Sequence, residues 1–555
     1  MDLKKFEGID TRFLHKNDKG CADVVNFRIT ADGSLQKRCG YRLLRTFSGN
    51  VRAIWTGRLD GTVCAYVLVG NTVSLFYPST NKLLTVGTVN TSSGEADFFY
   101  YRSGLYLADG KQIYTVGNTG IGTPYGYVPL RGKDWPDTLM GELYEPKNLL
   151  CNKGRITYVI REDHSSFLRI DSRISYIDAV YVNGSLISEA SYSITSLGDT
   201  ISVSSLSGGD RVEVYFTYAS DTGSTDGLLS CTRATVFGGI SNERPFLWNG
   251  NDKTVMYSSS FVSENSLKQS RKVFSQSDAL YFPVDHEFTV GDGSSPITAV
   301  SRHYDRLLIF TETGAWMADS SACGVEDHPV MSINSKAGVI SRGAEARLGN
   351  QPCTVGQSAI YRWLSTTDEL DECNAYSISD ALTDKLPKQF FEDARVFADI
   401  QKDELIFCSP SLGDTVYVYQ SSGSHWVRFD GINADRFVAL GDSVGFLYGK
   451  SLYVFDGSLS QDEGGKEIVG VFESNVIPLS THGTGRISSV TAALEGECEL
   501  SIRFDGEQEP SVCVPLKSGK KQRLTAKRAR TARLSIKAGG DGRQTVRSIS
   551  LTTRQ

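Results

Sequence analysis

The sequence of 555 residues is poor in proline and methionine and has no long stretch with the apolar periodicity of a helix. It contains 15 prolines and five methionines, against 54 glycines, 25 tyrosines and 26 phenylalanines. Collagen, coiled coils and all-α bundles are therefore excluded. Hydrophobic residues make up 40% of the chain, which also excludes wholesale disorder. Because glycine and aromatic residues together favour tight turns and short strands, we predict an all-β fold.

The sequence also lacks the usual marks of secretion, membrane insertion and metal binding. Its eleven cysteines, scattered from Cys21 to Cys513, are odd in number and form no Cys-x-x-Cys pair. We therefore expect free thiols in a reducing cytoplasm. The start of the chain has no apolar stretch of signal-peptide length, and no run approaches the ~18 apolar residues of a membrane span. None of the seven histidines lies three to five residues from another, so we predict no metal and no cofactor.

Charge is distributed unevenly along the chain. The net charge is −6, yet the segment from Thr491 to the C-terminus holds 13 basic and seven acidic residues. From Lys517 to Lys537 there are nine basic residues and no acidic one. This stretch could contact phosphate groups or an acidic partner surface. Alternatively, it is a solvated surface that balances nearby acids, namely Glu495, Glu497, Glu499, Glu507 and Glu509.

A repeating pattern of short apolar segments and turn residues begins near Val51. Short apolar segments separated by Gly, Asn or Asp predict four antiparallel strands within about 40 residues, which is the pattern of a propeller blade. The predicted strands are Val51–Thr56, Thr62–Val69, Thr72–Tyr77 and Lys82–Val89. Similar units recur as far as Gly457, so we predict a β-propeller of five to seven blades. An unrelated series of hairpins in β-sandwiches is the alternative.

Two further units interrupt and follow this repeat. Residues 177–218 predict five short strands around an Asn183-Gly184 turn, which indicates a small β-sandwich inserted into a propeller loop. Residues after 457 begin with a Gly- and acid-rich linker and then alternate strands and turns, which predicts a terminal sandwich. The predicted organisation is an N-terminal arm over 1–50, the first part of the propeller over 51–134, an inserted β-sandwich module over 135–231, the second part of the propeller over 232–457, and a linker with a C-terminal β-sandwich over 458–555.

Two local sequence patterns resemble catalytic or phosphate-binding motifs, but neither has the structural context that such a motif needs. Residues 445–451 read GFLYGKS, but a phosphate-binding loop needs four residues between its glycines and a following helix. Ser443 lies in a Gly-x-Ser-x-Gly pattern that strand-forming residues follow, whereas a nucleophile elbow needs a helix. The acidic clusters at 326–327, 368–372 and 462–463 are interpreted as solvated loops. We therefore predict no catalytic residue and no enzymatic activity.

One motif near the N-terminus is more specific. Asn26-Phe27-Arg28 is followed by the sequence DGSLQKRCGY over residues 32–41. This resembles an arm of bacteriophage tail proteins, in which Asn is followed after a few residues by Gly-x-Leu-x-Lys-Arg-Pro-Gly. The motif is similar to the start of the nozzle (tail tubular) and DNA-stabilising hub proteins of short-tailed phages. Cys39 stands where the family usually has proline, while Lys37, Arg38 and Gly40 are kept.

The resemblance implies a structural role in a virion tail assembled in the host cytoplasm. Such proteins form rings, often sixfold, that extend the portal and adaptor channel, line the DNA exit path, help retain the genome and anchor fibres or spikes. The expected partners are thus further copies of the chain, portal or adaptor proteins, tail fibres or spikes, and double-stranded DNA passing without sequence specificity. The alternative is a propeller glycosidase or carbohydrate-binding propeller acting on host surface polysaccharide. The expected partner or DNA contacts are Lys37, Arg38, Lys517, Lys520, Lys521, Arg523, Lys527, Arg528, Arg530 and Arg533.

Overall fold

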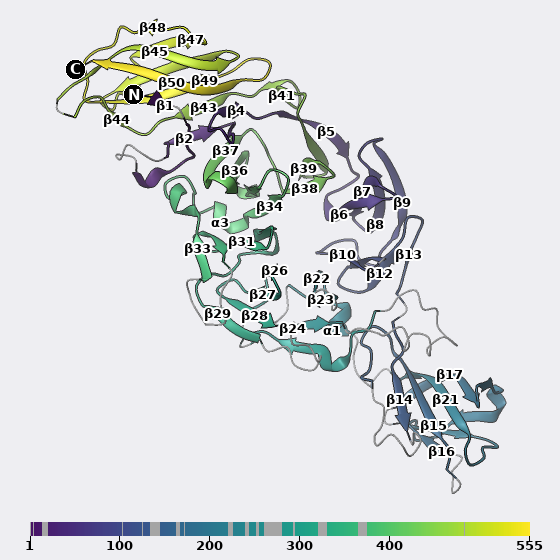
Figure 1. The fold of residues 1–555 in the computed structure, drawn as a ribbon. Coiled ribbons are helices and arrows are strands. Elements are labelled where there is room, and N and C mark those ends of the chain that lie inside the picture. The colour runs from purple at the N-terminus through teal and green to yellow at the C-terminus, as the bar shows by residue number, and fades with distance from the viewer. Residues whose placement is uncertain are drawn as a thin grey trace.

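Short strands joined by tight turns form most of the regular structure in the computed structural model (Figure 1). The structure describes residues 2–3, 5–13, 20–102, 104–124, 126–133, 145–161, 167–170, 173–219, 226–238, 243–250, 255–259, 280–291, 293, 295–319, 330–364, 374–481 and 483–554. The acidic clusters at 326–327 and 368–372 lie outside these residues. The predicted all-β class is confirmed.

The central feature is a ring of seven four-stranded antiparallel blades within the described ranges. Six of them are separate sheets, and one is part of a larger sheet. The first strand of each blade contacts the first strand of the next, and β38 (Arg436–Leu440) of the last blade contacts β6 (Val51–Leu59) of the first, so the ring closes. This is a β-propeller, at the upper end of the predicted five to seven blades. Each blade consists of short strands with buried residues on both faces, as expected for sheets packed face to face around an axis.

Six of these blades are built from consecutive strands. The first two are β6 (Val51–Leu59), β7 (Thr62–Val69), β8 (Thr72–Tyr77), β9 (Lys82–Thr88), and β10 (Asp97–Tyr101), β11 (Gly104–Ala108), β12 (Ile113–Val116), β13 (Ile121–Gly122). The third and fourth are β22 (Arg233–Phe237), β23 (Arg244–Trp248), β24 (Val255–Ser258), β25 (Glu287–Thr289), and β26 (Ala299–His303), β27 (Arg306–Phe310), β28 (Ala315–Asp319), β29 (Val330–Asn334). The fifth and sixth are β30 (Glu345–Leu348), β31 (Gln351–Val355), β32 (Ile360–Trp363), β33 (Ala375–Ser377), and β34 (Arg395–Asp399), β35 (Glu404–Cys408), β36 (Thr415–Gln420), β37 (His425–Asp430).

The last blade combines both ends of the propeller sequence. Its first three strands are β38 (Arg436–Leu440), β39 (Ser443–Tyr448) and β40 (Ser451–Asp456). Its outer strand is β5 (Gly40–Thr46), which pairs antiparallel with β40 from Gly40 opposite Asp456 to Thr46 opposite Ser451. The N-terminal segment therefore supplies the strand that completes the ring.

The inserted module follows the second blade and is seen apart from the ring at the lower right of Figure 1. Two sheets share one apolar core that includes Ile156, Val180 and Phe216. At the hairpin turn, Asn183 and Gly184 both have positive φ, as a type I′ turn requires. The module's strands are β14 (Leu130–Lys133), β15 (Lys153–Val159), β16 (Phe167–Arg169), β17 (Ile174–Val182), β18 (Ser185–Leu186), β19 (Tyr192–Ile194), β20 (Thr200–Val203) and β21 (Arg211–Tyr218).

The C-terminal sandwich contains strands from both ends of the chain. One of its sheets has the order β3-β4-β50-β45-β48, with β1 also paired to β50. The other runs β2-β43-β49-β46-β47 and is continuous with the sixth blade, because β2 also pairs with β37. The N-terminal strands are β1 (Asp2–Leu3), β2 (Asp23–Val25), β3 (Phe27–Ile29) and β4 (Leu35–Lys37). The C-terminal strands are β43 (Gly470–Glu473), β44 (Ile477–Pro478), β45 (Arg486–Glu495), β46 (Cys498–Phe504), β47 (Val512–Leu516), β48 (Gln522–Arg523), β49 (Thr531–Ala538) and β50 (Thr545–Arg554).

The predicted arm is thus part of the folded body. Its residues supply strands to both sandwich sheets and to the last blade, and one apolar cluster joins Val24, Phe27 and Leu35 to buried residues of the propeller and of the sandwich. Strands of two or three residues are stable only beside an existing sheet. The predicted linker contains a small hairpin of β41 (Gln461–Asp462) and β42 (Lys466–Glu467).

Helical segments are short throughout the described residues. None of them is long and apolar enough to cross a membrane. The nine described cysteines are free thiols. The helical segments are η1 (Thr11–Phe13), η2 (Glu189–Ser191), α1 (Asp226–Leu229), η3 (Val284–His286), η4 (Arg342–Ala344), η6 (Ser379–Leu382), α3 (Phe390–Asp393), η7 (Pro410–Leu412) and η8 (Ser421–Gly423).

Candidate functional site

Arg38, expected at a partner or DNA contact, lies inside the chain. Its guanidinium donates one 2.7 Å hydrogen bond to each carboxylate oxygen of Asp462, and both side chains are almost fully buried. The remaining N–H groups donate to the Asn26 side-chain oxygen and to the carbonyls of Cys39 and Asp430. All five guanidinium donors are therefore used within the chain. In this structure Arg38 joins the arm to the hairpin after the propeller and is not available on the surface.

The other residues of the arm motif have equally defined positions. Asn26 adopts a positive φ of 54° and its amide nitrogen donates to the Val469 carbonyl. Gly33 has φ of 81° in the turn between β3 and β4, and Leu35 is fully buried. A Cβ atom on Gly40 would lie 1.8 Å from the Gln461 carbonyl oxygen, so only glycine fits there. The motif specifies how arm, propeller and sandwich meet.

Lys37 also points inward, where its ammonium donates to the Gly540 carbonyl at 2.7 Å. Burial lowers the pKa of Lys37. Together with Arg38 it lines a groove of about 540 Å³ between the propeller and the sandwich. The groove's charged lining residues are all basic: Arg28, Lys37, Arg38, Lys402 and Arg543. Three of them already have acidic partners, because Arg28 pairs with Glu404, Arg38 with Asp462 and Lys402 with Asp399. Acidic side chains of the same chain therefore neutralise most of the positive charge of this groove.

The basic C-terminal stretch lies at one edge of the sandwich. It leads from β47, the last strand of one sheet, to β48, the last strand of the other. Figure 1 shows both strands on the side of the sandwich away from the propeller. We call the exposed basic residues of this region that precede β49 the basic edge, and they are Lys517, Lys520, Lys521, Arg523, Lys527, Arg528 and Arg530. Arg533 differs from them, because it lies half-buried in β49, an interior strand of its sheet.

The basic edge is only partly balanced by neighbouring acids. Lys527 forms an ion pair with Glu507, whereas Glu495 pairs with Arg547 outside the edge. In the described part of the chain, no ion pair involves Lys517, Lys520, Lys521 or Arg523. Cationic residues on edge strands also protect a sheet from pairing with another chain. Both interpretations of the stretch, a partner contact and a solvated surface, are compatible with these positions.

The local motifs of the sequence have ordinary structural roles. Residues 443–456 form the β39–β40 hairpin, with Gly449 at a positive φ of 56° in its turn. Ser443 begins β39 on the exposed surface, two residues after Gly441. Asp462, interpreted as a solvated acid, is instead the buried partner of Arg38. Among the residues described, no group of three His, Cys, Asp or Glu side chains is placed to hold a metal ion.

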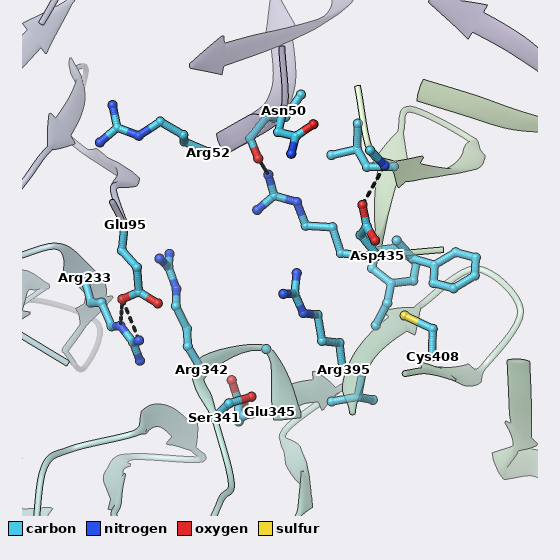
Figure 2. Close-up of a pocket in the computed structure, with 18 of the residues that line it drawn as sticks. Asn50, Arg52, Glu95, Arg233, Ser341, Arg342, Glu345, Arg395, Cys408 and Asp435 are labelled. Carbon is cyan, nitrogen blue, oxygen red and sulfur yellow. Dashed lines mark hydrogen bonds and ion pairs between the residues drawn. The ribbon is translucent and has the colours of Figure 1, made fainter. Parts of the chain in front are cut away.

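A second cluster, which sequence inspection missed, lies where the inner strands of the blades converge. A pocket of about 530 Å³ is lined mainly by residues at or next to the beginnings of these strands. We call it the axial arginine pocket, after its five arginines: Arg52, Arg233, Arg342, Arg395 and Arg436. Figure 2 shows Arg342 and Arg395 rising side by side into the space between Glu95 and Asp435. The acidic residues of the lining are Glu95, Glu345 and Asp435.

Three of the five arginines have partners that hold them in place. Arg52 donates to the backbone carbonyls of Gly70, Thr91, Ser93 and Gly94, so it ties together two loops. Arg233 donates two hydrogen bonds to Glu95 and one to the Thr298 carbonyl of the next blade. Arg342 forms an ion pair with Asp97. The contacts of Arg233 connect neighbouring blades. The pair of Arg342 with Asp97 instead joins the second blade to the segment that precedes the fifth.

The other two arginines share the pocket without an acidic partner. Arg395 makes no side-chain hydrogen bond or ion pair within the described residues, and Arg436 donates from Nη2 to the Val51 carbonyl at 3.0 Å. Asp435 is close, but its Oδ2 accepts from the Gly449 amide. Burial, together with repulsion from Arg395 and Arg342, lowers the pKa of Arg436 to about 10. The Arg436 guanidinium therefore still carries positive charge at neutral pH.

Comparison with known proteins adds little beyond the fold. No protein-family model and no curated protein matches this chain. The similar solved structures include PorZ of Porphyromonas gingivalis, described as a bacterial surface component of the type-IX secretion system, with 9% identity, 80% of this chain covered, 44% of that chain spanned and a TM-score of 0.36. They also include the AfRom2 CNH domain, with 7% identity and a TM-score of 0.36. This match covers 75% of this chain and 99% of that domain. The β-propeller domain of Cps50 (Swd1) from Myceliophteria thermophila has 10% identity and a TM-score of 0.35, and the match covers 75% of this chain and 99% of that domain. At these scores we draw no functional conclusion from them.

Proposed function

We propose that this chain is a structural protein of a short-tailed bacteriophage tail. In this proposal, six copies form a ring that extends the portal and adaptor channel, surrounds the DNA exit path and helps to retain and deliver the genome. The chain acts as a scaffold and not as an enzyme. It is assembled in the host cytoplasm, and its further partners are adaptor proteins and tail fibres or spikes.

The observation that carries the proposal is the structural role of the arm motif. Asn26, Gly33, Leu35, Arg38 and Gly40 are the residues that resemble the tail proteins, and each has a buried or sterically restricted position. A motif that specifies the junction of arm, propeller and sandwich supports similarity in architecture. A chance match would be expected to lie on residues that tolerate substitution.

Two features of the surface fit the same role. The inserted module stands apart from the ring, which suits a contact with a neighbouring copy or with a fibre (Figure 1). The basic edge lies on the far side of the sandwich and suits an acidic adaptor surface or the DNA backbone. A net charge of −6 for the whole chain disfavours tight general binding of DNA, so that a genome can slide past.

The experiment is mass spectrometry of purified virions of the phage that encodes this chain. The proposal predicts that the chain is present in virions in a fixed ratio to the portal protein and that it is lost when the tails are removed. Complete absence of the chain from virions would overturn the proposal. Release of reducing sugar from host envelope by the isolated chain, abolished by substitution of a single carboxylate, would favour a propeller glycosidase instead.

A further inference from the structure

The axial arginine pocket holds more positive charge than its own acids neutralise. Arg233 and Arg342 are paired with Glu95 and Asp97, respectively. Arg395 and Arg436 remain without a carboxylate partner in the described part of the chain. Figure 2 shows the Arg395 side chain directed into the open space of the pocket.

This arrangement is unfavourable for the empty protein. Two like charges in a partly buried space repel each other, and each loses part of its hydration. Propeller closure does not by itself require a charge at this position, because two inner strands begin with uncharged residues, Val51 of β6 and Ala299 of β26. Unpaired charges that converge on a concave site are typical of binding sites whose ligand supplies the missing charge.

We propose that the axial arginine pocket binds a small molecule through an oxyanion, a phosphate or carboxylate group, held between Arg395 and Arg436. A guanidinium presents planar N–H donors whose spacing matches two oxygens of such a group. The volume of about 530 Å³ lies in the range of small-molecule sites and leaves room for the rest of the ligand. Glu345 and Asp435 in the same lining can accept hydrogen bonds from ligand hydroxyl groups. This site does not depend on the proposed role in a phage tail.

The direct test is isothermal titration calorimetry of the full chain with pyrophosphate and, separately, with citrate. We expect saturable binding of at least one of these probes. Binding of pyrophosphate alone identifies phosphate as the recognised group, and binding of citrate alone identifies carboxylate. Absence of binding of both probes at millimolar concentrations would overturn the proposal.

Three variants locate the binding. Arg395→Gln removes the unpaired charge and is expected to weaken binding by about tenfold or more, because hydrogen bonds between charged groups are the strong ones. Arg395→Lys keeps the positive charge but lacks the planar pair of N–H donors of the guanidinium, so this variant should bind with intermediate affinity. Arg58→Gln is the matched control, since Arg58 is an exposed arginine in a hairpin of the first blade. Equal affinities of the wild-type and Arg395→Gln proteins would contradict the assignment.

Thermal unfolding without ligand separates binding from folding. If Arg395 serves a ligand, then Arg395→Gln leaves the melting temperature unchanged or raises it, because one of two repelling charges is removed. If Arg395 instead supports the fold, the same variant lowers the melting temperature without changing the affinity of the remaining folded protein. That second result would overturn the proposal. Calorimetry decides on binding, because phosphate salts also stabilise folded proteins by exclusion from their surface.

Discussion

The guanidinium of Arg38 and the carboxylate of Asp462 form two hydrogen bonds of 2.7 Å across 424 positions of sequence. Both side chains are buried, so neither has water as an alternative partner. Arg38→Met leaves the Asp462 charge buried without its partner, and we expect a loss of about 3–5 kcal/mol in the free energy of unfolding. Chemical denaturation of the full chain measures this change.

The control for this prediction is a more exposed pair on the neighbouring strand. Arg42 and Asp456 lie 3.2 Å apart, with half of the Arg42 side chain exposed. Arg42→Met should therefore cost less than about 1 kcal/mol. The double variant Arg38→Met with Asp462→Leu should recover part of the stability, since no buried charge remains. Equal losses for Arg38→Met and Arg42→Met would contradict the role given to Arg38.

Gly40 begins the strand that closes the propeller. A Cβ atom there would lie 1.8 Å from the oxygen and 2.6 Å from the carbon of the Gln461 carbonyl, and backbone cannot move aside as a flexible side chain can. We expect Gly40→Ala to destabilise the protein by at least about 1–3 kcal/mol and to expose the N-terminal segment to limited proteolysis. Gly457→Ala is the matched control, because open space surrounds Gly457. Unchanged proteolysis of Gly40→Ala would show that the strand is not held as described.

The arm and the ring closure show where sequence reasoning reached its limit. Alternation and turn residues sufficed for the hairpins of the first blade, where Asp60 and Gly61 both have positive φ. They could not show that β5 pairs with β40, because that pairing joins Gly40 to Asp456. For the same reason the sequence alone indicates a solvated acid at Asp462, since its partner Arg38 is far away in sequence.

The axial arginine pocket was missed because its residues have no local spacing. They range from Arg52 to Arg436 and meet only when the blades close. A signal was nevertheless present, since Arg233, Arg395 and Arg436 are each the first residue of an inner strand. This signal becomes visible only after the limits of the blades are known. The predicted residues Lys37 and Arg38 were recognised through the motif, but their burial depends on contacts with the distant C-terminal region.

Glu345 should make stability depend on pH. Burial raises the pKa of Glu345 to about 7, although the Ser301 hydroxyl and the Arg347 guanidinium oppose this shift. The folded state therefore binds more protons than the unfolded chain between the ordinary value of 4.5 and about 7. The contribution of Glu345 is most favourable below this window and is lost as pH rises through it. Urea unfolding at pH 5 and pH 8 should show a smaller decrease in stability for Glu345→Gln than for the wild type, and an unchanged decrease would contradict the shift.

The basic edge predicts salt-dependent binding of DNA or of an acidic partner. Replacing Lys517, Lys520, Lys521 and Arg523 with glutamine should weaken any binding of a duplex DNA fragment and reduce its dependence on salt, since each phosphate contact contributes about 0.9 to the slope of log K against log salt. Fluorescence anisotropy at several salt concentrations measures both quantities. The control has the same number of exposed charges removed from the propeller: Arg58, Lys82, Lys111 and Lys388. Identical slopes for the two variants would favour the solvated-surface interpretation.

The proposed tail role rests most directly on self-assembly. Native mass spectrometry of the full chain, purified from virions and also expressed alone, measures the number of copies in each particle. The account predicts a closed assembly of six copies. A particle that is monomeric under all conditions, from a chain that purified virions do not contain, would contradict it.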